Sequence, residues 1–149
     1  MMAGIEWSGV NELQARLLQA HAKALMELGG ALYVEGETIM ELSKRRVPVD
    51  LGALKGSGFV ETPEYSGHKA EVTLGYGGPA GYREAVKAGI SGELAAKVPG
   101  YALLQHERTD YHHRGQGEPF YLATAVDDFR PGAGQRIARR IQRRRNAIL

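Results

Sequence analysis

The stretch that decides the fold is "VPVDLGALKGSG", residues 47–58, because it ends one long helix and turns the chain into strands. Val47 precedes a proline, and a residue in that position avoids the α-helical region, so the helix before it must stop here. Asp50 is placed to cap a single helical turn over residues 51–54. The glycines at positions 52, 56 and 58 then provide a turning connection.

Residues 10–46, on the N-terminal side, have the pattern of one helix. At roughly 1.5 Å per residue it is about 50 Å long, more than a compact domain of this size needs. Ser8 or Asn11 can cap its start. Gly29, Gly30 and Gly36 inside it indicate either a kink or the close approach of a neighbouring element. Its apolar residues recur at spacings of three, four and seven and form one stripe: Leu13, Leu17, Ala20, Ala24, Leu28, Ala31, Leu32, Ile39 and Leu42.

Two strands are predicted on the C-terminal side. "SGFVET" (57–62) and "KAEVTLGY" (69–76) flank "PEYSGH" (63–68), which reads as a hairpin loop, and the second strand alternates apolar with polar residues. Residues 77–100 are rich in Gly and Ala, and we expect a long excursion with at most a helical turn or two. A loop this long in a small domain is usually functional or disordered.

The rest of the chain returns to regular structure. "YALLQHE" (101–107) is predicted as a short helix or strand, followed by a loop. Pro119 suits the first position of a helix over residues 119–129. "RPGAG" interrupts it, and residues 135–149 form a last helix. We therefore expect one domain over residues 1–128, with a long loop at 77–100, and a basic C-terminal helix over 129–149.

Composition limits the function classes. The chain carries a net charge of +2, but residues 130–149 hold seven arginines and no Asp or Glu, so the other 129 residues carry −5. There is no cysteine, which excludes disulfides, thiol nucleophiles and cysteine zinc sites. The N-terminus lacks a basic segment followed by an apolar one, so we expect no signal peptide. No apolar run approaches the roughly 20 residues of a membrane helix.

The histidine-rich stretch "HERTDYHH" raises the question of a metal site. His106, His112 and His113 lie beside Glu107 and Asp110, but no helical register brings the histidines together. Ligand types without ligand spacing are weak evidence, so we expect no metal site and no cofactor. No serine lies in a G-x-S-x-G elbow, and no motif combines a nucleophile, a base and an orienting group. We expect no enzymatic activity.

The basic C-terminal helix is the clearest candidate for a contact surface. Its arginines line one helical side, which favours non-specific binding to DNA phosphates or to an acidic protein partner. A solvated basic helix is the third possibility. The predicted contact residues are Arg136, Arg139, Arg140, Arg143, Arg144 and Arg145.

Taken together, the landmarks resemble the HK97 gp10-like family, the small neck and tail-completion proteins of long-tailed phages and related gene transfer agents. Four features carry the resemblance, in the family's order. They are the long N-terminal helix (10–46), "VPVDLGALKGS" (47–57), "YALLQHE" (101–107) and "GEPFYLATAVDD" (117–128). The chain departs from the family in its longer excursion at 77–100 and in the break at Pro131-Gly132.

The resemblance implies an α+β fold in which the long N-terminal helix packs on a small antiparallel β-sheet, with a C-terminal helix alongside. It also implies a structural virion protein, assembled in the host cytoplasm, that forms a homo-oligomeric ring, commonly a hexamer. The ring joins the head-completion or adaptor protein to the tail terminator or tail tube. For the subunit contacts we expect the long loop and the histidine loop to contribute, through Tyr82, Arg83, His112, His113 and Arg114. The alternative is a basic-tailed protein that binds nucleic acid without sequence preference.

Overall fold

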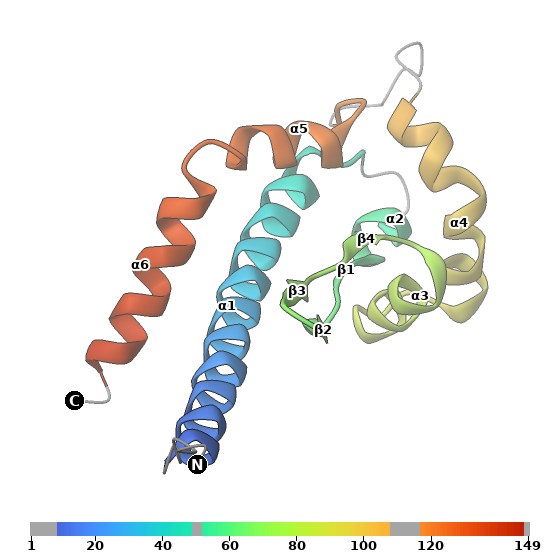
Figure 1. Ribbon diagram of the computed structural model, residues 1–149. Helices are drawn as coiled ribbons and strands as arrows, with labels where there is room; N and C mark the ends of the chain where they lie inside the picture. The colour runs from blue at the N-terminus through green and yellow to red at the C-terminus, as the bar shows by residue number, and fades with distance from the viewer. Residues whose placement is uncertain (1–8, 49–51, 108–116, 148–149) are drawn as a thin grey trace, which may run out of the picture.

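The computed structural model describes residues 9–48, 52–107 and 117–147. The predicted α+β class is confirmed: a long N-terminal helix, small antiparallel strand pairs and C-terminal helices (Figure 1). The elements in chain order are α1 (Val10–Arg46), α2 (Ala53–Gly56), β1 (Gly58–Val60), β2 (Glu64–Ser66), β3 (Lys69–Glu71), β4 (Leu74–Tyr76), α3 (Gly78–Lys87), α4 (Gly92–Glu107), α5 (Tyr121–Phe129) and α6 (Ala133–Asn146).

Helix α1 is one helix of 37 residues and ends where the sequence predicts. Val47 is extended, and its N–H donates to the Ser43 carbonyl at 2.9 Å, which closes the last turn ahead of the proline. The predicted start is wrong in one respect. Gly9, in the left-handed conformation (φ 87°), occupies the N-cap without a side-chain cap, so Asn11 does not cap the helix, and Ser8 lies outside the described residues.

The glycines of α1 serve close packing. The Tyr65 ring occupies the space that a side chain on Gly29 would need. A Cβ on Gly36 would lie 3.0 Å from a methyl of Val60 and 3.4 Å from one of Val72. The glycines therefore let the strands lie directly on the helix, and α1 runs unbroken through these positions (Figure 1).

The first predicted strand is present in shortened form as β1, and the second is divided into β3 and β4. β1 pairs with β4, and β2 pairs with β3, both antiparallel, with Glu64 opposite Glu71. The expected hairpin loop at 63–68 was wrong, because residues 64–66 form strand β2. Pro63 has no N–H to donate, so the ladder is interrupted there and resumes as a second pair. The turn at Gly67 (φ 55°) joins β2 to β3, and we call this second pair the β2–β3 hairpin.

The predicted excursion at 77–100 was also wrong, because the structure places two helices there. Gly77 (φ 74°) turns the chain into α3, and the Ser91 hydroxyl accepts from the Leu94 N–H at the start of α4. Small residues such as Ala85, Ala95 and Val98 are fully buried, so the Gly- and Ala-rich composition reflects close helix packing. α4 continues through residues 101–107, which confirms the helical alternative for that stretch.

The helix predicted over residues 119–129 starts two residues later in the structure. Helix α5 begins at Tyr121, after Phe120 in the left-handed conformation (φ 56°), so Pro119 lies in a turn and not in the helix. The predicted break is confirmed: α5 ends at Phe129, and Gly132 (φ 74°) precedes α6. Helix α6 then runs antiparallel along α1 (Figure 1).

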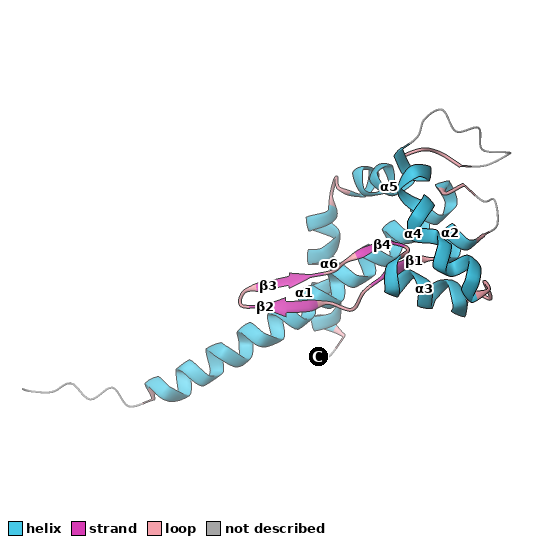
Figure 2. Ribbon diagram, turned by 90° about the vertical axis from the view of Figure 1, so that its right-hand side faces the viewer, coloured by secondary structure: helices cyan, strands magenta, loops and turns pink. Residues whose placement is uncertain are grey.

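The core lies at the C-terminal end of α1, and the other end projects. All residues from 10 to 20 are exposed, including Leu17 at 62% and Leu13 at 59%, so this part of the predicted apolar stripe is uncovered. Figure 2 shows it extending beyond the other helices and strands. None of the described helices is both long and apolar enough to cross a membrane. The buried core cluster consists of Val47, Ala53, Leu54, Val98 and Tyr121, packed against Tyr76, Ile90, Leu94, Ala102 and Leu122.

Candidate functional site

His106 is a packing residue. Its ring meets those of Phe120 and Tyr121 edge to face, at centroid distances of 5.5 and 5.0 Å. Its carbonyl accepts from the Phe120 N–H at 2.6 Å. Burial lowers the pKa of the His106 imidazole, and the charge of Glu107 opposes that shift. Among the described residues no three His, Cys, Asp or Glu side chains gather as metal ligands, while Asp110, His112 and His113 lie outside that part of the chain.

Tyrosines continue this contact into the core. The Tyr121 hydroxyl donates to the Ala102 carbonyl at 3.2 Å, and its ring stands perpendicular to that of Tyr76 at 5.2 Å. The Tyr76 hydroxyl forms a 2.9 Å hydrogen bond with the buried Ser43 hydroxyl. Burial raises the pKa of Tyr76 to about 12, although the bond to Ser43 acts in the opposite direction. These contacts join α1, β4, α4 and α5, and we call them the aromatic joint.

The four landmark stretches of the sequence meet at this joint. The long helix contributes Ser43, and "VPVDLGALKGS" contributes Leu54. "YALLQHE" contributes Ala102, and "GEPFYLATAVDD" contributes Tyr121. Segments as far as 78 residues apart in the chain (Ser43 and Tyr121) therefore form a single packing unit.

The predicted subunit-contact residues lie elsewhere. Tyr82 and Arg83 are both exposed, but they lie on helix α3 and not in a loop, which corrects the sequence prediction. The Tyr82 hydroxyl lies over Gly92, at the start of α4. The other three predicted residues, His112, His113 and Arg114, fall outside the described residues.

Three of the six predicted arginines bind carboxylates of α1. The Nε atoms of Arg136 and Arg140 lie 2.9 and 3.3 Å from the two oxygens of Glu35, whose side chain is 6% exposed. Arg145 binds Glu27 at 2.8 Å. Sequence reasoning missed both glutamates. Glu27 and Glu35 are eight residues apart, with Ala31 midway, so they lie on one face of α1. This acidic face of α1 could have been matched from the sequence to the arginine-lined face of α6.

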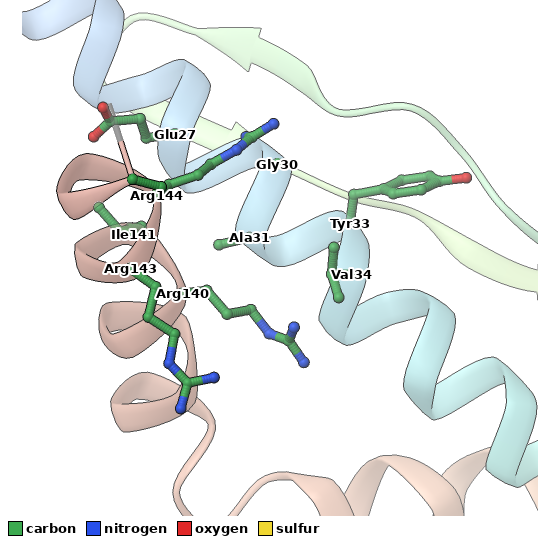
Figure 3. Close-up of a pocket in the computed structure, with 10 residues that line it drawn as sticks. Glu27, Gly30, Ala31, Tyr33, Val34, Arg140, Ile141, Arg143 and Arg144 are labelled. Carbon is green, nitrogen blue, oxygen red and sulfur yellow. The ribbon is translucent and has the colours of Figure 1, made fainter. Parts of the chain in front are cut away.

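The other three arginines, Arg139, Arg143 and Arg144, have no carboxylate partner within the described ranges. Two of them border a groove of about 630 Å³ between α1 and α6, which we call the α1–α6 groove. Figure 3 shows their side chains extending from α6, with Arg144 reaching toward Gly30 on α1. Its apolar lining includes Ala31, Val34 and Ile141, and its charged border is formed by Arg140, Arg143, Arg144 and Glu27.

An acidic surface lies on the opposite side of α1. Glu64 and Glu71 face each other directly in the β2–β3 hairpin, and both are exposed. Tyr65 is next to Glu64 in β2, so its side chain points to the opposite face of the hairpin, where it packs on Gly29 of α1. The two carboxylates therefore point away from that helix. Glu61 is exposed nearby. Within the described chain none of the three forms an ion pair.

The molecule thus carries a basic groove, an acidic hairpin and a projecting apolar helix, all on its surface. No protein-family model, no curated protein and no solved structure matches the chain.

Proposed function

We propose that this chain is a structural virion protein of a tailed phage or phage-like particle, a ring-forming component that joins the head connector to the tail. The observation that carries the proposal is the aromatic joint. The stretches that resemble the neck and tail-completion family are scattered through the sequence, yet they pack on one another in the fold.

The exposed surfaces support an assembly role. The projecting half of α1 carries large apolar side chains in solvent, including Leu17, Leu18 and Met26. Leu13 and Leu17 are four residues apart and so lie on one face of the helix, and exposed apolar side chains gathered in this way are typical of protein interfaces. Identical subunits that contact through different faces close into a ring when the rotation closes, which fits the proposed homo-oligomer. Its neighbours would be the head-completion or adaptor protein and the tail terminator or tail tube, and the protein would have no catalytic role.

A deletion in the particle tests this function. Particles produced without this chain should accumulate as filled heads and separate tails, and expression of the chain in trans should restore joined particles. Electron microscopy of negatively stained lysates counts the three species directly. Particles that lack the protein and still carry firmly attached tails would refute the proposal.

Contact with DNA remains the second candidate, favoured by the three arginines without carboxylate partners. Each neutralised phosphate contributes about −0.9 to the slope of log affinity against log salt, so three free arginines predict a slope of roughly −3 and all six roughly −5. Filter binding between 50 and 300 mM NaCl measures that slope. Absence of DNA retention at the lowest salt would remove this candidate.

A further inference from the structure

We propose that the α1–α6 groove binds the β2–β3 hairpin of a second copy of this chain, with Arg143 and Arg144 of one subunit meeting Glu64 and Glu71 of the next. The inference rests on the proposed ring and names the contact that builds it.

The groove side supplies cations that the subunit itself does not neutralise. Glu27 and Glu35 of α1 bind three arginines of α6, whereas Arg143 and Arg144, at the border of the groove, form no ion pair within the described residues. The surplus charge borders a concave surface with an apolar lining. A charge pair that forms against such a lining is less screened by water than one on a flat surface. The groove therefore favours an occupant that brings carboxylates.

The hairpin side supplies those carboxylates in a fixed arrangement. Like charges directly opposite each other destabilise a strand pair. Glu64 and Glu71 occupy such positions, and neither forms an ion pair within the described residues, although Lys69 is exposed on the same face of the hairpin. Their backbones are held by the strand ladder, so little freedom is lost when they bind. Two arginines from a neighbouring subunit would turn this repulsion into attraction.

The two surfaces lie on opposite sides of the same helix. In Figure 1 the hairpin and α6 flank α1, and in Figure 2 the hairpin lies in front of α1 with α6 behind it. Glu35 faces α6, whereas Gly29 and Gly36 face the strands, which agrees with the views. Surfaces placed this way cannot pair symmetrically between two copies. They pair head to tail, and that arrangement closes into a ring when the rotation between successive subunits closes.

A second copy of the chain would bind through both the α1–α6 groove and the β2–β3 hairpin, whereas DNA would bind only the groove. Phosphates would use the arginines but would be repelled by Glu61, Glu64 and Glu71. The hairpin would then keep its opposed charges without a partner.

Reciprocal charge reversal tests the contact. One variant carries Glu64→Lys and Glu71→Lys, and the other carries Arg143→Glu and Arg144→Glu. Each is expected to raise the dissociation constant of the oligomer at least tenfold, and to fail to restore joined particles to a lysate that lacks the chain. Mixed one to one, the two variants should recover assembly, because each altered hairpin then meets an altered groove and each native hairpin a native groove. Mass photometry at 100 mM NaCl and the particle count are the readouts.

A matched control reverses the exposed acids Glu93 and Glu107 on α4 to lysine, with the same change in net charge, and should assemble as the wild type does. Circular dichroism of every variant excludes misfolding as the cause of a loss.

The outcomes separate this inference from the function on which it rests. Variants that assemble and join particles like the wild type refute the contact and leave the ring intact. If only the arginine variant fails, the groove binds DNA or an acidic protein of another kind, and the second-copy contact is refuted. If wild-type chain is dispensable for joined particles, the proposed function itself falls, whatever the charge variants do.

Discussion

Removing the Glu35 carboxylate should release α6 from α1 while the core stays folded. Glu35 binds Arg136 and Arg140 through one oxygen each. No residue of α6 is classed as buried, so these pairs and the contact at Glu27 carry much of its attachment. We expect Glu35→Ala to open this helix locally and to leave the aromatic joint in place.

The magnitude follows from the exposure of the partners. Exposed ion pairs are worth about 0–1 kcal/mol, and removing one member of a buried pair costs about 3–5 kcal/mol. The Arg136 and Arg140 side chains are 33% and 42% exposed, so both guanidinium groups regain water once Glu35 is gone. Arg136 also keeps its bond to the Pro131 carbonyl at 2.9 Å. We therefore expect a loss of about 2 kcal/mol, which corresponds to roughly 30-fold more frequent opening.

Hydrogen exchange measured by mass spectrometry reports this opening directly. Amides of residues 133–146 should exchange roughly 30-fold faster in Glu35→Ala than in the wild type, and those of α5 should not change. The control is Glu41→Ala, which removes an exposed carboxylate and its pair with Arg45 on the same helix, and should change α6 exchange less than threefold. Exchange of α6 that stays within threefold of wild type in Glu35→Ala would refute the reasoning, as would equal acceleration of α5.

Three further outcomes are expected. Gly81→Ala places a Cβ 2.6 Å from a backbone carbonyl oxygen and should lower the free energy of unfolding in urea by about 1–3 kcal/mol. Gly134→Ala, which has open space around it, should not destabilise the protein, and equal effects of the two variants would contradict the packing. Leu54→Ala should lose about 2–5 kcal/mol in the same assay, and a loss below 1 kcal/mol would place this side chain outside the core. The folded-state pKa of Tyr76, about 12, lies above its ordinary value of 10.0, so the folded chain keeps that proton longer than the unfolded chain. The stabilisation that this proton gives below pH 10 should therefore be lost between pH 10 and 12, by up to about 3 kcal/mol, and Tyr76→Phe should make unfolding curves less pH-dependent there.

Local signals in the sequence predicted the frame of the fold. The 3.6-residue periodicity of α1 extends over ten turns, and prolines at 48 and 131 mark helix boundaries regardless of the rest of the chain. Pro119 gave too early a start for α5, because Phe120 adopts a left-handed conformation before the helix, with its ring packed against His106.

Features set by tertiary contact could not be predicted. The Gly- and Ala-rich stretch at 77–100 shows no strong periodicity, because its buried positions are filled by small residues such as Ala85 and Ala95. Arg136 and Glu35 are 101 residues apart, and nothing local to either residue indicates the other. The sequence therefore predicts which arginines of α6 form the candidate surface. It does not predict which of them pair with carboxylates of α1.

The projecting half of α1 has a consequence for how fast and how tightly it can be bound. An isolated helix of about 17 residues is marginal in water, because forming its first turn fixes several residues for one hydrogen bond. Here the C-terminal half of α1 is already held by the strands and by α6. Residues 10–26, most of which are exposed, only have to propagate an existing helix, and they avoid the nucleation step. A partner that binds Leu13 and Leu17 therefore meets a rod about 25 Å long that is already formed, and loses little of its binding free energy to folding the segment it recognises.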